Sequence, residues 1–307
     1  MPFQWTKKTL LAQVKEMDWT LSQAQVSEPW NEYLHDFSLP DRTLAEHFVG
    51  KVKSAGFELC VQVWQGKTVE KNALLVHGLY DHVGLYRHLI RHCLEQNYRV
   101  IAFDLPGHGL SSGAQASIDD FDQYQEVLAD MLIASKIHFT EPLHAFGQST
   151  GGGILLHYLL TQPRPVLERV NLIAPLIRPY EWRKIQFLLP LLKRFVRQLK
   201  RGQSHNSQDQ EFLNLVWHTD PLQAKSLNIN WVIAVRRWWS FIEAQLPCSY
   251  PIEVVQGDND HSVAWQHNLA VLKRLFPKAK VHRIAGAGHH LVNELEPMRA
   301  QMWQCFD

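Results

Sequence analysis

The stretch of sequence that decides the fold is Pro142-Leu-His-Ala-Phe-Gly147-Gln-Ser149-Thr-Gly151-Gly-Gly-Ile-Leu-Leu156. It begins as a short apolar run, turns through Gly-Gln-Ser-Thr-Gly, and continues over residues 152–161 with the spacing of a helix. In a G-x-S-x-G turn between a strand and a helix, the glycines let the backbone crowd together and the serine hydroxyl is raised above the sheet. The pattern predicts that Ser149 is a nucleophile, with a purely structural tight turn as the alternative.

Similar apolar runs recur along the chain and end in turn residues. They cover residues 72–78, 99–104, 142–147, 169–174, 251–257 and 279–285, with helical patterns such as 86–96 and 121–136 between them. Continuous apolar runs are typical of strands buried on both faces, so their alternation with helices predicts an α/β fold with a mostly parallel central sheet flanked by helices. Residues 46–54 and 57–65, joined at Ala55-Gly56, are expected to add an antiparallel pair at one edge.

The alternation of strands and helices stops between about residues 178 and 247, where the periodicity is helical and no strand is expected. From 178 to 201, eight Lys or Arg residues stand against one acid, Glu181, and bulky apolar residues lie between them. We therefore predict a core formed by residues 46–177 and 248–307, an inserted helical cap at 178–247, and an N-terminal extension at 1–45. The packing of this extension cannot be assigned from the sequence.

Composition excludes several classes of protein. The chain has 307 residues, 46% of them hydrophobic and 20% charged, as expected of a globular protein with a sizeable core. Its 31 basic and 30 acidic residues give a net charge of +1, which argues against nucleic acid as a partner. The four cysteines are far apart and form no C-x-x-C pair, so we expect reduced thiols and no metal site.

Cofactor and targeting motifs are also missing from the sequence. No Walker A sequence and no G-x-G-x-x-G after a strand occurs, so no cofactor is expected. No run approaches the roughly 18 apolar residues of a membrane-spanning helix, and the first residues do not resemble a secretory signal. These features predict a soluble, cytoplasmic protein, with contact at the inner face of a membrane left open. The oligomeric state cannot be derived.

A nucleophilic serine needs a base and a carboxylate that orients the base, and each should follow a later strand. Gly257-Asp258-Asn259-Asp260 follows one predicted strand, and Gly286-Ala-Gly288-His289-His290 follows the last one. We assign Asp260 as the acid and His289 as the base. Asp258 and His290 remain alternatives, Asp258 otherwise being a carboxylate that caps the loop. The chain order Ser, Asp, His is the one found in α/β-hydrolases.

The same chemistry needs hydrogen-bond donors for the oxyanion of the transition state. One is expected from the backbone N–H of Thr150, directly after the nucleophile. The other is expected from the loop His77-Gly-Leu-Tyr-Asp-His82, where the N–H of Leu79 is the candidate.

Three further motifs carry a family resemblance: His77-Gly-Leu-Tyr-Asp-His82, Phe103-Asp-Leu-Pro-Gly-His-Gly-Leu-Ser-Ser-Gly113 and Gly288-His-His-Leu-Val-Asn-Glu294. With the Ser149 turn, they resemble the α/β-hydrolase superfamily over about residues 46–300. The similarity is greatest to its monoacylglycerol lipase and lysophospholipase branch, which includes serine aminopeptidase-like members. The resemblance implies a Ser149–Asp260–His289 triad without a cofactor. Gln148 and Thr150 depart from the His and Met usual in that branch.

The resemblance implies hydrolysis of carboxylic esters through an acyl-enzyme, most simply of single-chain lipid esters such as lysophospholipids or monoacylglycerols. Gln148, Trp182 and Trp238 are expected to contact the substrate, and the basic cap could touch a membrane surface. A short-chain carboxylesterase or thioesterase is one alternative, and a catalytically silent binding protein is another. A serine aminopeptidase would need an acidic side chain in the cap to hold the substrate ammonium; the candidates are Glu181, Asp209, Glu211, Asp220 and Glu243.

Overall fold

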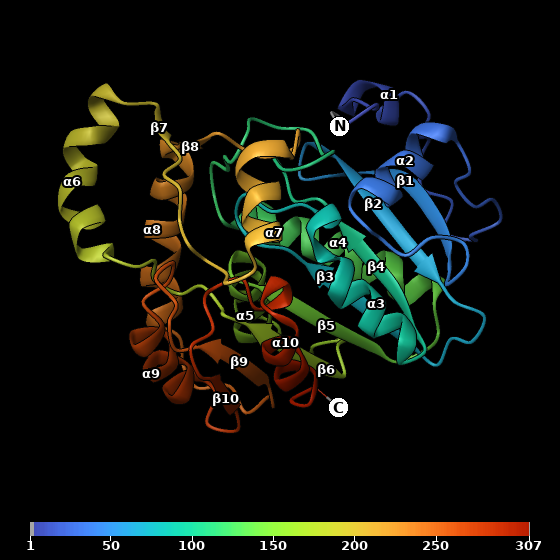
Figure 1. The fold of residues 1–307 in the computed structure, drawn as a ribbon. Coiled ribbons are helices and arrows are strands. Elements are labelled where there is room, and N and C mark those ends of the chain that lie inside the picture. Colours follow the sequence, from blue (N-terminus) through green and yellow to red (C-terminus); the bar gives the residue numbers. More distant parts are fainter. Residues whose placement is uncertain (1–2, 307) are drawn as a thin grey trace.

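The computed structural model describes residues 3–306, and within α6 it does not describe the side chains of residues 191–193 (Figure 1). Its centre is a sheet of eight strands in the order β1-β2-β4-β3-β5-β6-β9-β10. The strands are β1 (Glu46–Ser54), β2 (Phe57–Gln65), β3 (Lys71–Val76), β4 (Tyr98–Phe103), β5 (Leu143–Gln148), β6 (Arg169–Ile173), β9 (Glu253–Gly257) and β10 (Lys280–Ile284).

The strands from β4 to β10 pair in parallel, whereas β1 and β2 form an antiparallel pair whose second strand joins β4 at the edge. This arrangement confirms the predicted fold class. The β1–β2 pair has the bounds that the sequence predicted, because it turns at Ala55 and Gly56, both with positive φ. The other predicted strands are correct to within two residues at each end.

Helices cover both faces of the sheet. Side chains of α4 (Asp122–His138), α5 (Thr150–Thr161) and α9 (Trp265–Leu275) belong to one core cluster, and those of α3 (Arg87–Glu95) and α10 (Glu296–Trp303) belong to the other. Neighbouring side chains of a central strand such as β3 alternate between the two cores: Leu74 and Val76 lie in the first, Ala73 and Leu75 in the second. Burial on both faces explains why the central strands are largely apolar, whereas the edge strand β10 is mostly exposed and carries charged residues.

The N-terminal extension packs onto the core shared with α3. It contains α1 (Lys7–Leu11) and α2 (Glu28–Asp36), and its fully buried side chains include Leu10, Trp30 and Tyr33. Glu16 bridges to Lys51 of the edge strand β1. The extension thus covers one side of the sheet and its edge, which the sequence left unassigned.

The predicted cap lies between β6 and β9. This interval holds α6 (Trp182–Phe195), β7 (Gln198–Lys200), α7 (Gln210–Asn214), a π-helical turn (Leu215–Thr219), β8 (Ser226–Asn228) and α8 (Ile229–Glu243). Figure 1 shows α6 as the outermost element, on the far side of α8 from the sheet.

The expectation of a cap without strands is wrong, because β7 and β8 pair antiparallel. Each has only three residues, too few to show alternation in the sequence. Among the residues that the structure describes, no helix is both long and apolar enough to cross a membrane.

Candidate active site

Ser149 stands at the turn between β5 and α5 in a strained backbone conformation, with φ 52° and ψ −112°. Its N–H donates to the carbonyl of Ile173 at 2.9 Å, and its carbonyl accepts from Leu176 at 2.9 Å, so β6 and the chain after it hold the turn. A Cβ at Gly151 would lie 1.9 Å from the carbonyl oxygen of Val76, so only glycine fits at that position. Strain held by surrounding contacts is typical of a functional residue.

His289 and Asp260 form a buried pair with 2.7 Å between Nδ1 and Oδ2. The carboxylate is held from its other side as well, because Oδ1 accepts the N–H groups of Ser262 and Val263 at 2.7 and 3.1 Å. Gln256 donates to Oδ2 at 2.9 Å. Asp260 therefore has a fixed orientation, and it fixes that of the imidazole.

The electrostatics of this pair favour a charged imidazole. Burial alone lowers the pKa of His289, but the Asp260 carboxylate outweighs burial, so the pKa is raised from its usual 6.5. Burial raises the pKa of Asp260, and the charge and hydrogen bond of His289 outweigh it, so the net shift is downward. The pair can accept a proton on the imidazole while the carboxylate stays ionised.

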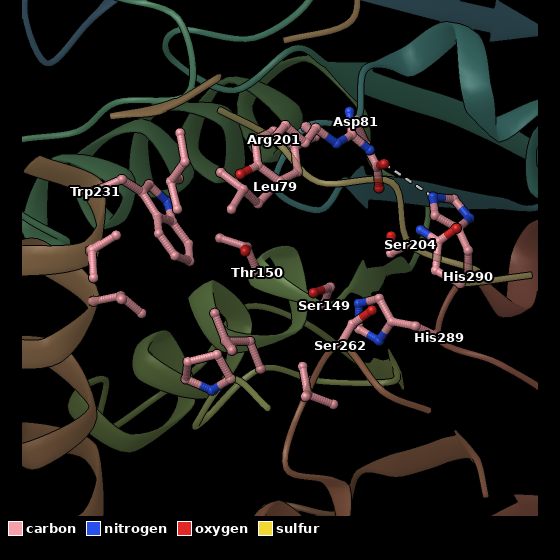
Figure 2. Close-up of a pocket in the computed structure, with 18 of the residues that line it drawn as sticks. Leu79, Asp81, Ser149, Thr150, Arg201, Ser204, Trp231, Ser262, His289 and His290 are labelled. Carbon is pink, nitrogen blue, oxygen red and sulfur yellow. Dashed lines mark hydrogen bonds and ion pairs between the residues drawn. The ribbon is translucent and has the colours of Figure 1, made fainter. Parts of the chain in front are cut away.

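Ser149 and His289 line the same cavity, and Figure 2 shows the Ser149 hydroxyl facing the ring of His289. Because Nδ1 of His289 is bonded to Asp260, Nε2 is the ring nitrogen left for the serine. The structure thus brings together Ser149, Asp260 and His289 from the ends of β5, β9 and β10.

The alternative acid and base have other partners. Asp258 is exposed and accepts the N–H of Gly286 at 2.7 Å, so it caps the loop that follows β10. In His290, Nε2 lies 3.1 Å from Oδ1 of Asp81, and Nδ1 accepts the side-chain amide N–H of Asn293 at 3.2 Å. Its two nitrogens are therefore occupied.

The loop after β3, which carries the predicted oxyanion donor Leu79, is held by His77. Its Nε2 accepts the N–H of Leu105 at 2.8 Å, which leaves Nδ1–H to donate to the carbonyl of Gly78 at 2.7 Å. Burial lowers the pKa of His77 to about 3, so the ring stays neutral and keeps both bonds.

The N–H of Gly78 is fixed in turn by Asp81 and Tyr86. It donates to Asp81 Oδ2 and to the Tyr86 hydroxyl, both at 3.2 Å, and Tyr86 donates to the same carboxylate at 2.9 Å. Leu79 and Thr150 both line the cavity that contains Ser149. These hydrogen bonds hold Gly78, directly before Leu79, whose N–H is the expected oxyanion donor.

The cavity has a volume of about 280 Å³, near the lower end for ligand sites. One side is apolar and built largely from α8, and the other is polar. Ile185, Trp231, Val232, Val235 and Trp239 are among the apolar residues, and Asp81, Arg201, Ser204, Asn206 and His290 are among the polar ones. Figure 2 shows Ser149 and Thr150 between Trp231 at one end and His290 at the other. A ligand with an apolar and a polar part could lie across the serine.

The structure places the three residues expected to contact substrate elsewhere, since none belongs to the described lining of this cavity. Gln148 is buried behind His289, donating to its backbone carbonyl at 2.9 Å. Trp238 stacks on Phe121 at 4.2 Å in the core. Trp182 lies under the guanidinium of Arg178 at 3.8 Å.

Trp231, which the sequence analysis did not single out, and Trp239, the neighbour of the expected Trp238, line the cavity instead. They and Val235 recur every four residues, which puts them on one face of α8, whereas Trp238 is turned about 100° from Trp239. The four-residue spacing is therefore the sequence signal that distinguishes the cavity-lining face of α8 from the face that carries Trp238.

None of the acidic residues considered for an aminopeptidase belongs to the described lining of the cavity. Asp220 is buried against His82, with 2.8 Å between Oδ2 and Nε2. Glu243 pairs with Arg178, Glu181 pairs with Lys184, and Asp209 caps α7, while Glu211 is exposed. Of the described cap residues 178–247, the charged one that lines the cavity is Arg201, a cation. Within residues 3–306, no group of His, Cys, Asp and Glu is arranged to hold a metal ion.

Comparisons with known proteins find a family that matches most of the chain and relatives that match part of it. The family described as serine aminopeptidase, S33, matches residues 67–296. The chain is 31% identical over 118 residues to the monoacylglycerol lipase of Mycolicibacterium smegmatis, covering 38% of this chain and 41% of that protein. It is 27% identical over 112 residues to phospholipase YtpA of Bacillus subtilis, covering 36% of this chain and 43% of that protein. Each match spans less than half of the relative.

A solved structure shares the fold over most of the chain. The soluble variant of monoglyceride lipase from Saccharomyces cerevisiae, in complex with a substrate analogue, has a TM-score of 0.73 and 17% identity. The match covers 87% of this chain and 96% of that chain. At this identity, the likeness shows the fold alone.

Proposed function

The chain belongs to the serine aminopeptidase S33 family of hydrolases, and we propose that it is a serine esterase that cleaves single-chain lipid esters. The predicted resemblance to the monoacylglycerol lipase branch of the α/β-hydrolases is confirmed by the family match and the sequence relatives. The observation that carries the proposal is the cavity shared by Ser149 and His289, with Asp260 bonded behind the imidazole at 2.7 Å.

In the proposed mechanism, Ser149 Oγ attacks the ester carbonyl while His289 Nε2 takes the hydroxyl proton. Asp260 stays ionised and stabilises the imidazolium. The N–H groups of Leu79 and Thr150 hold the oxyanion. His289 then gives its proton to the leaving alcohol, and a water that His289 deprotonates releases the acid from the acyl-enzyme.

The apolar side of the cavity supports a substrate with a hydrocarbon chain. Trp231, Val235 and Trp239 form one face of α8 towards the cavity, while the polar side can face a headgroup. The named relatives include a monoacylglycerol lipase and a phospholipase. A short-chain ester is the second candidate, favoured by the small volume of about 280 Å³. The position of the acidic cap residues, outside the described lining, does not favour an aminopeptidase.

The outer face of α6 supports a transient contact with the inner face of a membrane. Phe187 and Phe195 are 84% and 76% exposed, and Leu188 is 45% exposed. Arg183 and Arg194 on the same helix are exposed as well. Exposed aromatic residues next to cations suit the boundary of an anionic bilayer, where each basic residue contributes about 1 kcal/mol.

The proposed mechanism is tested by labelling the purified chain with a fluorophosphonate and weighing it intact. One adduct on the wild type and none on Ser149→Ala is expected. Hydrolysis of monoacylglycerols, lysophospholipids, short esters and aminoacyl amides then separates the candidate substrates. An adduct that persists in Ser149→Ala, or its absence from the folded wild type with and without detergent, would refute the serine mechanism.

A further inference from the structure

Arg201 is the one lysine or arginine among the described residues that line the cavity. It follows the last residue of β7. Figure 2 shows it on the side of the cavity that also carries Leu79 and Asp81. A cation in a cavity with a nucleophile bears on which substrates can bind there, and neither the proposed mechanism nor the predicted triad uses it.

The guanidinium of Arg201 is held in place by neutral groups. It stacks between the rings of Tyr80 and Trp217, 4.2 and 4.5 Å from their centroids. Its Nη1 donates to Gln223 Oε1 at 2.5 Å and to the carbonyl of Ala224 at 3.5 Å. These contacts order the planar fork before any ligand arrives, which lowers the entropic cost of binding.

The charge of Arg201 has no ion pair among the described contacts. Burial lowers the pKa of Arg201, and the nearby carboxylates of Asp81 and Asp220 offset this only in part. Both are bonded to other groups, Asp81 to His290 and Asp220 to His82. Arg201 is half-buried and bonded to neutral groups alone, so an anion that enters the cavity gains from pairing with its charge.

The cavity residues next to Arg201 lie near solvent, so an anion bound to Arg201 would sit close to the cavity entrance. Gly202 and Ser204, which closely follow Arg201 in the chain, also line the cavity and are exposed, so the cavity opens to solvent near Arg201. Asn206, which also lines the cavity, has a buried amide oxygen without a hydrogen-bond donor in the described part of the chain, and this acceptor can take a headgroup hydroxyl. Trp231 and Trp239 lie on the apolar side, where a hydrocarbon chain would enter.

We propose that Arg201 binds the phosphate of a lysophospholipid whose ester carbonyl lies at Ser149 and whose acyl chain packs against α8. This proposal rests on the proposed function and narrows it, because it selects anionic over neutral single-chain esters. The guanidinium fork matches two phosphate oxygens, a geometry that a lysine cannot reproduce. The hydroxyl side chain of Ser204 and the amide of Asn206 supply further polar groups at the headgroup.

The test compares lauroyl-lysophosphatidic acid with monolauroylglycerol, which share the acyl chain and the ester and differ by the phosphate. In the wild type, kcat/KM should favour the phosphate ester. Arg201→Gln should lower kcat/KM for it by about 10- to 100-fold and leave the value for monolauroylglycerol within about threefold. Arg201→Lys should restore only part of the loss.

Lys200→Gln is the matched control, because it removes the same charge from the neighbouring residue of β7, which is exposed and outside the described lining of this cavity. It should leave the ratio of the two substrates unchanged. An equal loss in both variants would show general attraction to charged lipid aggregates and would overturn the proposal. An unchanged ratio in Arg201→Gln would overturn it while the esterase function stands.

Binding separates failure of this proposal from failure of the proposed function. In Ser149→Ala, calorimetric titration should show lauroyl-lysophosphatidic acid bound more tightly than monolauroylglycerol, and adding Arg201→Gln should remove the difference. A wild type that hydrolyses neither ester but keeps this difference in binding refutes the esterase and retains the phosphate site. Equal binding of the two lipids refutes the site.

Discussion

The pairing of Asp260 with His289 makes a quantitative prediction for Asp260→Asn. Ser262 and Val263 donate backbone N–H groups to Oδ1, so the amide oxygen of the new side chain takes that place. The amide NH₂ then faces Nδ1 of His289, where Oδ2 now lies at 2.7 Å. It donates to Nδ1 and leaves the proton of the neutral ring on Nε2, which is the wrong tautomer for taking a proton from Ser149.

The cost follows from two contributions. Reaching the active tautomer leaves a buried donor unsatisfied, at about 1–3 kcal/mol, and the imidazolium loses a charge-assisted bond of about 1.5–3 kcal/mol. Together these give about 2.5–6 kcal/mol, a loss of about 70- to 25,000-fold in kcat/KM. Stability should change less, because the backbone donors of Ser262 and Val263 keep an acceptor, and Gln256, which loses Oδ2, keeps its bond to the carbonyl of Gly257.

The pH profile checks the same reasoning. His289 must be neutral to act as a base, and Asp260 raises its pKa from 6.5, so activity should fall on the acid side with a midpoint above 6.5. In Asp260→Asn, burial acts without the carboxylate, and the residual activity should show this midpoint at lower pH.

The assay is kcat/KM on a soluble ester from pH 5 to 9, with thermal unfolding to verify that the variants fold. Asp258→Asn is the control, because Asp258 is exposed and bonded to Gly286 instead, and its activity should stay within about twofold. The reasoning is refuted if Asp260→Asn keeps activity within tenfold of wild type, or if Asp258→Asn is the variant that loses it.

Three further perturbations test other parts of the structure. Gly78→Ala should lower kcat about 100-fold or more in a variant that thermal unfolding shows to be folded, because the new Cβ would lie 3.2 Å from Ser149 Cβ and 2.9 Å from Asp81 Oδ2 and would displace the oxyanion loop; equal kcat would exclude this role for the loop. Asp220→Ala should lower the free energy of unfolding in urea by about 3–5 kcal/mol, because it leaves His82 buried without its partner. The pKa of His82 is raised from 6.5 and that of Asp220 is lowered from 3.8, so the stabilisation by this ion pair should be complete between pH 3.8 and pH 6.5. It should decline at higher pH, where His82 loses its proton, and at lower pH, where Asp220 gains one. A destabilisation by Asp220→Ala that does not change with pH would argue against a charged pair. Phe187→Ser should reduce sedimentation with anionic vesicles and leave hydrolysis of a soluble short-chain ester unchanged, since Phe187 is 84% exposed; undiminished sedimentation would remove α6 from the membrane contact.

Much of the core could be predicted from the sequence because its signals are local. Strands buried on both faces stand out in the sequence as short, largely apolar runs. The turn at Ala55-Gly56 defines a hairpin with the observed bounds. The turn at Ser149 needs glycines on both sides, so its position can be identified without a structure.

The choice between neighbouring residues could be stated from the sequence but not settled by it. Asp258 and Asp260 follow the same strand two residues apart, and either could orient a histidine. In the folded chain, Asp260 is buried and bonded to His289, whereas Asp258 is exposed and bonded to Gly286. The loop after β10 makes this difference, and it lies nearly thirty residues along the chain from Asp260.

The lining of the cavity was decided by the tertiary structure alone. Trp238 and Trp239 are equivalent as local signals, yet one packs on Phe121 and the other lines the cavity. Arg201 was one of eight basic residues in its segment, and it reaches the cavity because β7 pairs with β8. A sequence pattern records which residues share a face of one element, but which face meets the nucleophile depends on the path of the chain between elements. Long-range packing sets that path, and no local pattern encodes it.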